Sequence, residues 1–262
     1  MALVHANFFS TTLGMERQVE VILPQEVNGI GLAGVEMAKK VPVLYLLHGG
    51  SDDQTIWQRR TSIERYACEK GLAVVMASTD LGFYSDQKYG YDYFQFFSKE
   101  LPELICEFFP LISDKREDTF VAGLSMGGFG ALKLGINCPE RFSYAASLSG
   151  MVDPVWEYEN RSDAYHLNNW GVIVELKESV NDLPYMLEKQ LKAGAELPRF
   201  FMCCGTEDFL YKPNVLFKER FADRIDLLYY EEPGTHEWGF WDRNIQKVID
   251  WLPLDKSKTM HV

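Results

Sequence analysis

Short apolar runs recur along the chain, and segments long enough for a helix separate most of them. The first two, Val4–Thr12 and Arg17–Leu23, are typical of strands, and the second alternates as R-Q-V-E-V-I-L. Val41–Leu47 instead reads V-P-V-L-Y-L-L, a nearly continuous apolar run. Continuous apolarity favours a strand buried on both faces, as in a parallel sheet covered by helices. The later runs of this kind are Leu72–Ala77, Thr119–Leu124, Tyr144–Leu148, Arg199–Cys204 and Asp226–Tyr230.

Helix-length segments alternate with these strands. They are Ile56–Glu69, Tyr93–Phe109, Met126–Asn137, Asn214–Asp223 and Phe240–Trp251. Strands that alternate with helices indicate βαβ units and a mostly parallel sheet. We therefore predict an α/β fold with one mostly parallel eight-stranded sheet and helices on both of its faces. The first two strands are expected to be antiparallel at one edge of this sheet.

One long segment, residues 151–198, interrupts the alternation after the sixth strand. It is rich in Trp, Tyr and Asn and contains one helical stretch near Val174–Lys192. Insertions at the carboxyl ends of parallel strands lie where ligands bind, so this segment is predicted to be a partial lid. Pairing of two subunits is the alternative. Asn28–Lys40 is Gly-rich and predicts a surface connection, and without repeats or linkers residues 1–262 are expected to form a single domain.

Composition narrows the partners. The formal net charge is −12, and such a bulk negative charge repels phosphate backbones and anionic membrane surfaces, so neither nucleic acid nor a membrane is an expected partner. The five cysteines are an odd number without a C-x-x-C pair, which favours a reducing compartment. The N-terminus has no signal-peptide pattern and no apolar stretch approaches about 20 residues, so a cytoplasmic protein is expected.

The strongest chemical signal is Gly123-Leu124-Ser125-Met126-Gly127, which fits the pattern G-x-S-x-G. It follows a predicted strand and precedes a predicted helix, which is the context of a nucleophile elbow. In such an elbow the serine stands on a sharp turn, and the flanking glycines remove side chains that would collide. The alternative is a glycine-rich turn with an incidental serine.

A serine hydroxyl needs a base to take its proton, and the chain has five histidines. His5 and His261 lie near the termini, and His166 falls within the 151–198 segment. His48 precedes the serine, whereas hydrolases of this kind follow the order Ser, acid, His. His236, in a loop after the last predicted strand, is therefore the candidate base, with a surface-loop histidine as the alternative.

Asp208 is the candidate acid, because it follows the apolar run that ends at Cys204 and lies between the serine and the histidine in the chain. Glu207 beside it is the competitor. An acyl-transfer site also needs donors for the oxyanion of its tetrahedral intermediate. The backbone N–H groups of Met126, directly after the serine, and of Gly50, in the loop after the third strand, are the candidates.

Aromatic residues are the candidate substrate contacts. Tyr84 and Tyr91, in the aromatic segment Gly82–Phe97, could form a pocket wall for a small acyl or aryl group. Trp57 and Trp238 are further candidates, and packing in the core is the alternative for all of them. The sequence has no Walker loop, dinucleotide fingerprint or metal-ligand spacing, so neither a cofactor nor a metal is expected.

Four motifs together resemble the esterase D group of α/β-hydrolases. They are H-G-G at 48–50, G-L-S-M-G-G-F-G-A-L at 123–132, G-T-E-D-F at 205–209 and G-T-H-E-W at 234–238. T-D-L-G-F-Y at 79–84 and H-E-W-G-F-W-D at 236–242 look closest to the bacterial tributyrin esterases. The resemblance implies an α/β-hydrolase fold, a catalytic triad of Ser125, Asp208 and His236, and an oxyanion hole made by the amides of Gly50 and Met126.

The expected activity is therefore that of a serine carboxylesterase, which hydrolyses short-chain acyl esters, acetyl to butyryl, through an acyl-enzyme intermediate. The expected partner is a small-molecule ester. Alternatives are a carbohydrate-directed acetyl or feruloyl esterase and an S-formylglutathione hydrolase-like thioesterase. A catalytically silent α/β-hydrolase fold used as a binding module is the alternative from another class. A homo-oligomer is left open.

Overall fold

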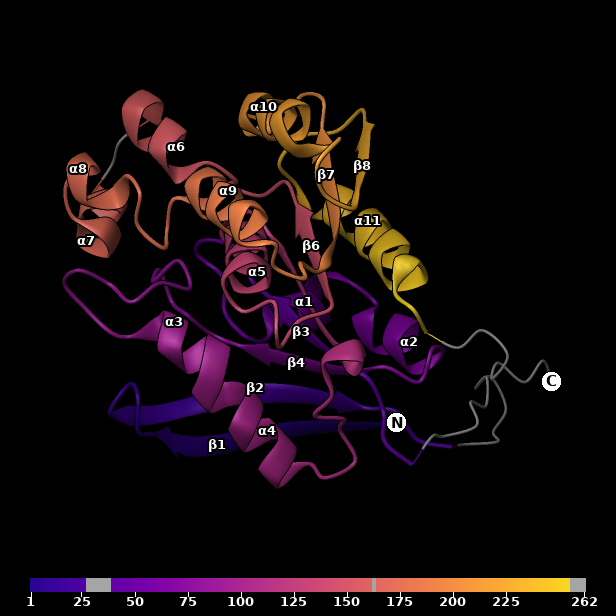
Figure 1. Ribbon diagram of the computed structural model, residues 1–262. Coiled ribbons are helices and arrows are strands. Elements are labelled where there is room, and N and C mark those ends of the chain that lie inside the picture. Colours follow the sequence, from indigo (N-terminus) through magenta and orange to yellow (C-terminus); the bar gives the residue numbers. More distant parts are fainter. Residues whose placement is uncertain (27–38, 162–163, 255–262) are drawn as a thin grey trace.

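The computed structural model describes residues 1–26, 39–161 and 164–254, and in these residues eight strands form one sheet (Figure 1). Its strand order is β1-β2-β4-β3-β5-β6-β7-β8. The strands are β1 (Ala2–Ser10), β2 (Met15–Leu23), β3 (Val43–Leu47), β4 (Ala73–Ala77), β5 (Thr119–Leu124), β6 (Tyr144–Leu148), β7 (Arg199–Gly205) and β8 (Leu227–Glu232). Most of the predicted connection Asn28–Lys40, and His261, lie outside the described residues.

The sheet confirms the predicted class. β1 and β2 form an antiparallel pair at one edge, β2 pairs antiparallel with β4, and every other neighbouring pair is parallel. β3, β4 and β5 are buried at every position, whereas β1 alternates between more and less buried residues. Helices on both faces account for the continuous apolar runs, and the edge hairpin accounts for the alternating pattern.

Helices cover the two faces of this sheet. One face is covered by α1 (Ile56–Arg60), α2 (Ile63–Cys68) and α11 (Trp238–Trp251). Their buried side chains form a core with sheet residues such as Leu44 and Val74. On the other face the core includes α4 (Leu101–Phe108), α5 (Met126–Asn137), α9 (Leu183–Ala193) and α10 (Tyr211–Phe221). Figure 1 shows α5 and α9 on one side of β6 and β7 and α11 on the other. The nucleophile-elbow helix α5 thus lies between the sheet and α9.

Two predicted helices differ in detail from the observed ones. The segment Ile56–Glu69 forms α1 and α2, because the backbone at Thr61 is extended and its hydroxyl donates to the carbonyl of Trp57. The segment Tyr93–Phe109 is a continuous run of α3 (Tyr93–Gln95), a π-helical turn (Phe96–Glu100) and α4. Pro102 has no N–H to continue the α-helical ladder, and the wider turn comes directly before it.

The segment between β6 and β7 contains more helix than predicted. α6 (Pro154–Arg161) and α7 (Ala164–Trp170) have no counterpart in the prediction. The predicted helical stretch Val174–Lys192 was wrong as one element, because it divides into α8 (Ile173–Leu176) and α9. Asp182 caps the start of α9 with a side chain that accepts from the N–H of Tyr185, a typical signal for a helix start.

Within the described ranges, no helix combines the length and the apolar character that crossing a membrane requires. The division of residues 1–262 into a single domain stays a prediction. So does the role of residues 151–198 as a partial lid.

Candidate active site

Ser125 stands on the sharp turn between β5 and α5. Its φ of 53° and ψ of −116° are unusual for a residue with a side chain, and glycines make the turn possible. A Cβ placed on Gly123 would lie 2.3 Å from the carbonyl oxygen of Gly127, and one on Gly127 would lie 2.5 Å from that of Leu47. The G-x-S-x-G spacing is therefore required by the close approach of three backbone segments.

Three side chains from different parts of the chain form one line of hydrogen bonds. Nε2 of His236 lies 2.9 Å from Oγ of Ser125, and Nδ1 of His236 lies 2.8 Å from Oδ2 of Asp208. The side chain of Asp208 is fully buried and that of His236 is 19% exposed. The other carboxylate oxygen of Asp208 accepts from the N–H of Leu210. This second bond holds the carboxylate toward the imidazole.

Glu207, the competing acid, lies in a different environment. Its carboxylate accepts from the backbone N–H of Gly234, and its pKa is lowered, first by this bond. The side chain thus braces the loop that leads to His236 from the outside. The structure places Asp208, and not Glu207, beside the imidazole.

The ring of His236 is enclosed by residues that the sequence did not single out. The ring centroid of Phe209 lies 4.4 Å from that of His236, and Trp241 contacts the imidazole edge-on at 4.9 Å. Phe209 itself is 52% exposed, and the guanidinium carbon of Arg161 lies 4.2 Å from the centroid of its ring. Arg161 belongs to α6, so the 151–198 segment reaches the surroundings of His236. No sequence pattern signals this contact.

The loop after β3 passes close to the serine. A Cβ placed on Gly49 would lie 3.6 Å from Cβ of Ser125. Gly50, the next residue, is exposed and an added Cβ would meet no atom within 4 Å, whereas Met126 is buried. The structure therefore brings the loop that carries one predicted oxyanion donor next to the residue that precedes the other.

His48 holds this loop in place. Its side chain is buried, with Nδ1 2.7 Å from the carbonyl oxygen of Gly49 and Nε2 accepting from the N–H of Thr79 at 3.1 Å. Burial lowers the pKa of His48, so the ring is neutral and Nδ1 is its donor. Sequence order excluded His48 as the base, but sequence reasoning missed this structural part. Its position at the end of a buried strand was the available signal.

Two of the four predicted substrate contacts were wrong. Trp57 and Tyr84 are 1% and 0% exposed, so neither ring offers a surface to a bound ester. Each is buried because its polar tip finds a backbone partner: Trp57 Nε1 donates to the carbonyl of Leu47, and the Tyr84 hydroxyl donates to that of His48. Tyr91 is 50% exposed, and Trp238 is half-buried between Trp57 and Trp241.

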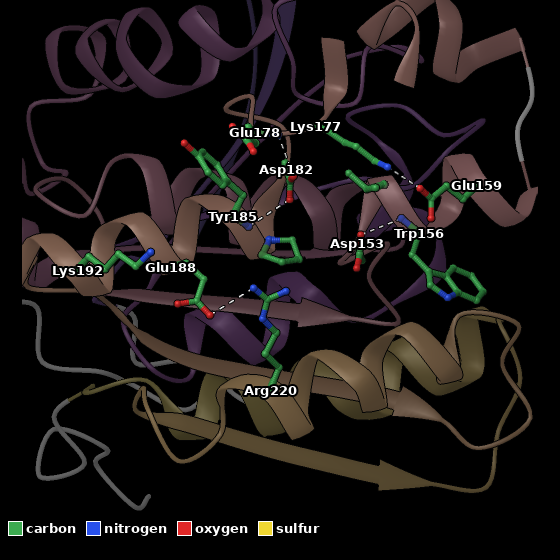
Figure 2. A pocket seen from close by; sticks show the side chains of 12 residues that line it. Asp153, Trp156, Glu159, Lys177, Glu178, Asp182, Tyr185, Glu188, Lys192 and Arg220 are labelled. Atoms are coloured by element: carbon green, nitrogen blue, oxygen red, sulfur yellow. Dashed lines mark hydrogen bonds and ion pairs between the residues drawn. The ribbon is translucent and has the colours of Figure 1, made fainter. Parts of the chain in front are cut away.

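A pocket of about 580 Å³ lies in the 151–198 segment against α10 (Figure 2). Its lining includes five carboxylates, three basic side chains and the ring of Trp156. Figure 2 shows Lys177 paired with Glu159, and Arg220 with Glu188. Ser125, Asp208 and His236 do not line this pocket. Among the described residues, no group of three or more His, Cys, Asp or Glu side chains is arranged to hold a metal ion.

The arrangement around Ser125 suits nucleophilic acyl transfer. A neutral imidazole that accepts from a hydroxyl can take its proton, and a carboxylate on the opposite nitrogen stabilises the resulting cation. The N-terminus of α5 and the loop after β3 border the same serine, where an oxyanion would form.

The chain belongs to the esterase family. It matches the family described as "Putative esterase" over residues 10–251, nearly its whole length. The expected resemblance to the esterase D group of α/β-hydrolases is thereby confirmed, and the chain is a carboxylic ester hydrolase.

Particular relatives agree with this class. The chain is 30% identical to an acetyl esterase of Caldicellulosiruptor saccharolyticus, with 96% of this chain and 98% of that protein covered. The solved structure of FphF, a fluorophosphonate-binding serine hydrolase of Staphylococcus aureus, superposes with a TM-score of 0.87 at 32% identity and covers 97% of this chain and 99% of its own. The S-formylglutathione hydrolase FrmB of the same organism has a TM-score of 0.84 at 32% identity, with 96% and 98% covered.

Proposed function

We propose that this protein is a serine carboxylesterase that hydrolyses short-chain acyl esters, from acetyl to butyryl. Ser125 is the nucleophile, His236 the general base and acid, and Asp208 the residue that orients and stabilises the imidazole. The observation that carries the proposal is the unbroken line of hydrogen bonds from Ser125 Oγ through His236 to the buried Asp208.

The reaction takes place in two halves. Ser125 Oγ attacks the carbonyl carbon of the ester while its proton moves to His236 Nε2, and the carbonyl oxygen becomes an oxyanion that accepts from the amides of Gly50 and Met126. The oxyanion then collapses, the bond to the alcohol breaks, and Nε2 returns the proton to the leaving oxygen. In the second half a water molecule attacks the acyl-enzyme in the same way and releases the acid.

The preference for short acyl groups is supported by the relative named an acetyl esterase. The same proposal includes residues 1–262 as a single domain and residues 151–198 as a partial lid. Support for the lid is the contact of Arg161 with Phe209, which in turn contacts His236. The exposed Tyr91 and half-buried Trp238 remain proposed substrate contacts. A cytoplasmic location is proposed from the cysteines, all five of which are free.

The test is Ser125→Ala with p-nitrophenyl acetate, butyrate and octanoate. We expect kcat to fall by at least about 10³-fold for every ester, because the proposed acyl-enzyme forms on the hydroxyl that the substitution removes. Ser143→Ala, a serine before β6 that is buried away from His236, is the matched control and should keep the wild-type rate. Hydrolysis by Ser125→Ala at the wild-type rate would refute the assignment.

A second experiment addresses a silent binding module. A fluorophosphonate probe should label the wild-type protein on Ser125 and leave Ser125→Ala unlabelled. Absence of labelling in a folded wild-type protein would favour the binding module over the esterase.

A thioesterase of the S-formylglutathione hydrolase type is the second candidate, since FrmB aligns over nearly the whole chain. The two are separated by kcat/KM for S-formylglutathione against p-nitrophenyl butyrate. Acetylated xylo-oligosaccharides and feruloyl esters complete the panel. A clear preference for any of these three substrates over the butyrate ester would replace the proposed substrate class while leaving the catalytic residues in place.

A further inference from the structure

Tyr84 is held in an unusual backbone conformation deep inside the protein. Phe83 and Tyr84 have φ values of 52° and 49°, a left-handed conformation that residues with side chains rarely adopt. The ring of Tyr84 fits against α5 at Gly130, where an added Cβ would lie 2.4 Å from Cδ2 of the tyrosine. Two consecutive residues in this conformation persist only when the surrounding structure requires them.

The tip of Tyr84 is bonded to the loop that carries a proposed oxyanion donor. Its hydroxyl donates to the carbonyl oxygen of His48 at 2.9 Å. His48 is the residue whose ring contacts the Gly49 carbonyl and accepts from Thr79, so the start of the loop is bonded through both its backbone and its side chain. Gly50 follows two residues after His48; it is exposed, and a Cβ added to it would meet no atom within 4 Å.

Lys133 on α5 holds the other end of the same arrangement. It is 0% exposed, and its Nζ donates to the carbonyl of Tyr84 at 3.1 Å and to Oγ of Ser85 at 3.0 Å. It also donates at 2.6 Å to Oδ1 of Asn181, which belongs to the 151–198 segment. The indole of Trp170, from the same segment, donates to Ser85 Oγ at 3.1 Å. One buried lysine thus joins the elbow helix, the Tyr84 backbone and the insertion.

We propose that Tyr84 and Lys133 are positioning residues for the oxyanion hole, Tyr84 by fixing the loop that carries Gly50 and Lys133 by fixing Tyr84. The inference rests on the proposed function, because it concerns the backbone amides of Gly50 and Met126 that would donate hydrogen bonds to the oxyanion. Neither residue touches the substrate. Both act by fixing the position of the Gly50 amide relative to Ser125.

The expected kinetic signature follows from this indirect role. A donor that meets the oxyanion stabilises the transition state and contributes little to binding of the ground-state ester. Loosening the loop should therefore lower kcat and leave KM nearly unchanged. A residue that lines the substrate pocket would instead raise KM.

Tyr84→Phe is the sharpest test, because it removes only the hydroxyl. Tyr229→Phe is the matched control, since the buried Tyr229 hydroxyl has no hydrogen-bond partner among the described residues. We expect Tyr84→Phe to lower kcat for p-nitrophenyl butyrate about tenfold with KM changed less than about twofold, a fraction of the 10²–10³ lost when a donor is deleted. Tyr229→Phe should keep both constants. Thermal unfolding of each variant checks that it is folded.

A pair of inhibitors separates positioning from general damage. A butyl trifluoromethyl ketone adds to Ser125 and forms an oxyanion, whereas the matching methyl ketone binds without this addition. In Tyr84→Phe the Ki of the fluorinated ketone should rise by the same factor by which kcat/KM falls, and the Ki of the methyl ketone should stay within about twofold.

Lys133→Met tests the second half of the proposal through a double-mutant cycle. It should lower kcat in the same way, and the double variant with Tyr84→Phe should lose less than the product of the two single effects.

Independent, multiplicative effects would overturn the coupling of Lys133 to Tyr84. Kinetics of Tyr84→Phe that match Tyr229→Phe, or a loss confined to KM, would overturn the role of Tyr84. In either case a wild-type enzyme that still hydrolyses esters shows that the proposed function survives. A folded wild-type protein that neither hydrolyses esters nor reacts with the probe refutes both proposals together.

Discussion

Two loops at the carboxyl end of the sheet each contain a histidine, and the different surroundings of the two rings give them different roles. The ring of His48, after β3, is buried, with Nδ1 beside the carbonyl oxygen of Gly49 and Nε2 beside the N–H of Thr79 and the hydroxyl of Ser78. The ring of His236, after β8, is partly exposed and both of its nitrogens face side chains, Ser125 and Asp208. Only the second ring lies between a serine hydroxyl and a buried carboxylate, whereas the first is tied to the backbone of the loop after β3.

The largest effect should come from removing the exchanging ring. His236→Ala is expected to lower kcat by at least about 10³-fold while the protein stays folded, because the serine then has no base. Steady-state hydrolysis of p-nitrophenyl butyrate and circular dichroism measure the two quantities. A variant that keeps more than about a tenth of the wild-type rate would contradict the role of His236 in the comparison.

Replacing the buried imidazole of His48 should mainly lower the stability of the fold. His48→Phe keeps the ring shape but leaves buried backbone groups of Gly49 and Thr79 unpaired, so the free energy of unfolding should fall by about 2–4 kcal/mol. Activity should fall by about tenfold, less than for His236→Ala, since the serine keeps its base. Urea denaturation measures the stability change.

The exposed His5 on β1, whose ring pairs with the carboxylate of Glu20, is the control for that experiment. His5→Phe should change the free energy of unfolding by less than about 1 kcal/mol, because an ion pair with an exposed partner contributes little. Equal losses for His48→Phe and His5→Phe would show that the bonds of the buried ring are not what holds the loop.

The buried Lys133 should make the stability of the protein depend on pH. Burial lowers the pKa of Lys133 to about 7, while Asp86 and Cys138 nearby act in the opposite direction. Between this value and the unfolded value of about 10.4 the unfolded chain binds more protons, so the contribution of Lys133 to stability rises with pH. Below pH 7 both states are charged and the contribution no longer changes with pH.

The measurement compares wild type with Lys133→Met from pH 7.5 to 9.5. The difference in the free energy of unfolding should shift in favour of the wild type as pH rises, by at most about 1.4 kcal/mol per pH unit, the value for one proton. A difference that is flat with pH, or that shifts toward the variant, would show that Lys133 stays charged in the folded protein.

The sheet and the elbow were predictable because their causes are local. The continuous apolar run of β5 indicates a strand that is buried on both faces. Gly123 and Gly127 are needed because a side chain at either position would collide with neighbouring backbone in the turn around Ser125. The order of Ser125, Asp208 and His236 along the chain predicted His236 among the five histidines, and the structure brings these three side chains together. The strand and the turn are read from short stretches of sequence, whereas the candidate acid and base are read from their order along the whole chain.

The aromatic residues were harder to place, because a ring can serve in a pocket or in the core. Tyr84 is in the core since its hydroxyl reaches the His48 carbonyl and its ring meets Gly130, and both partners are more than 30 residues away in the chain. Trp57 is similarly buried by its bond to Leu47 and its contact with Trp238. Composition and spacing contain no information about such distant partners.

The sequence alone therefore determined the fold class, the serine on its turn and the candidates for its base and acid. Strand burial and the glycines of the turn are written in short stretches of sequence, and the order of the three residues is written along the chain. Only the tertiary structure decided that His48 supports the loop after β3 and that Tyr84 packs inside the core. Those outcomes depend on which atoms meet when the chain folds, and a hydrogen-bond partner for a buried polar group has no fixed place in the sequence.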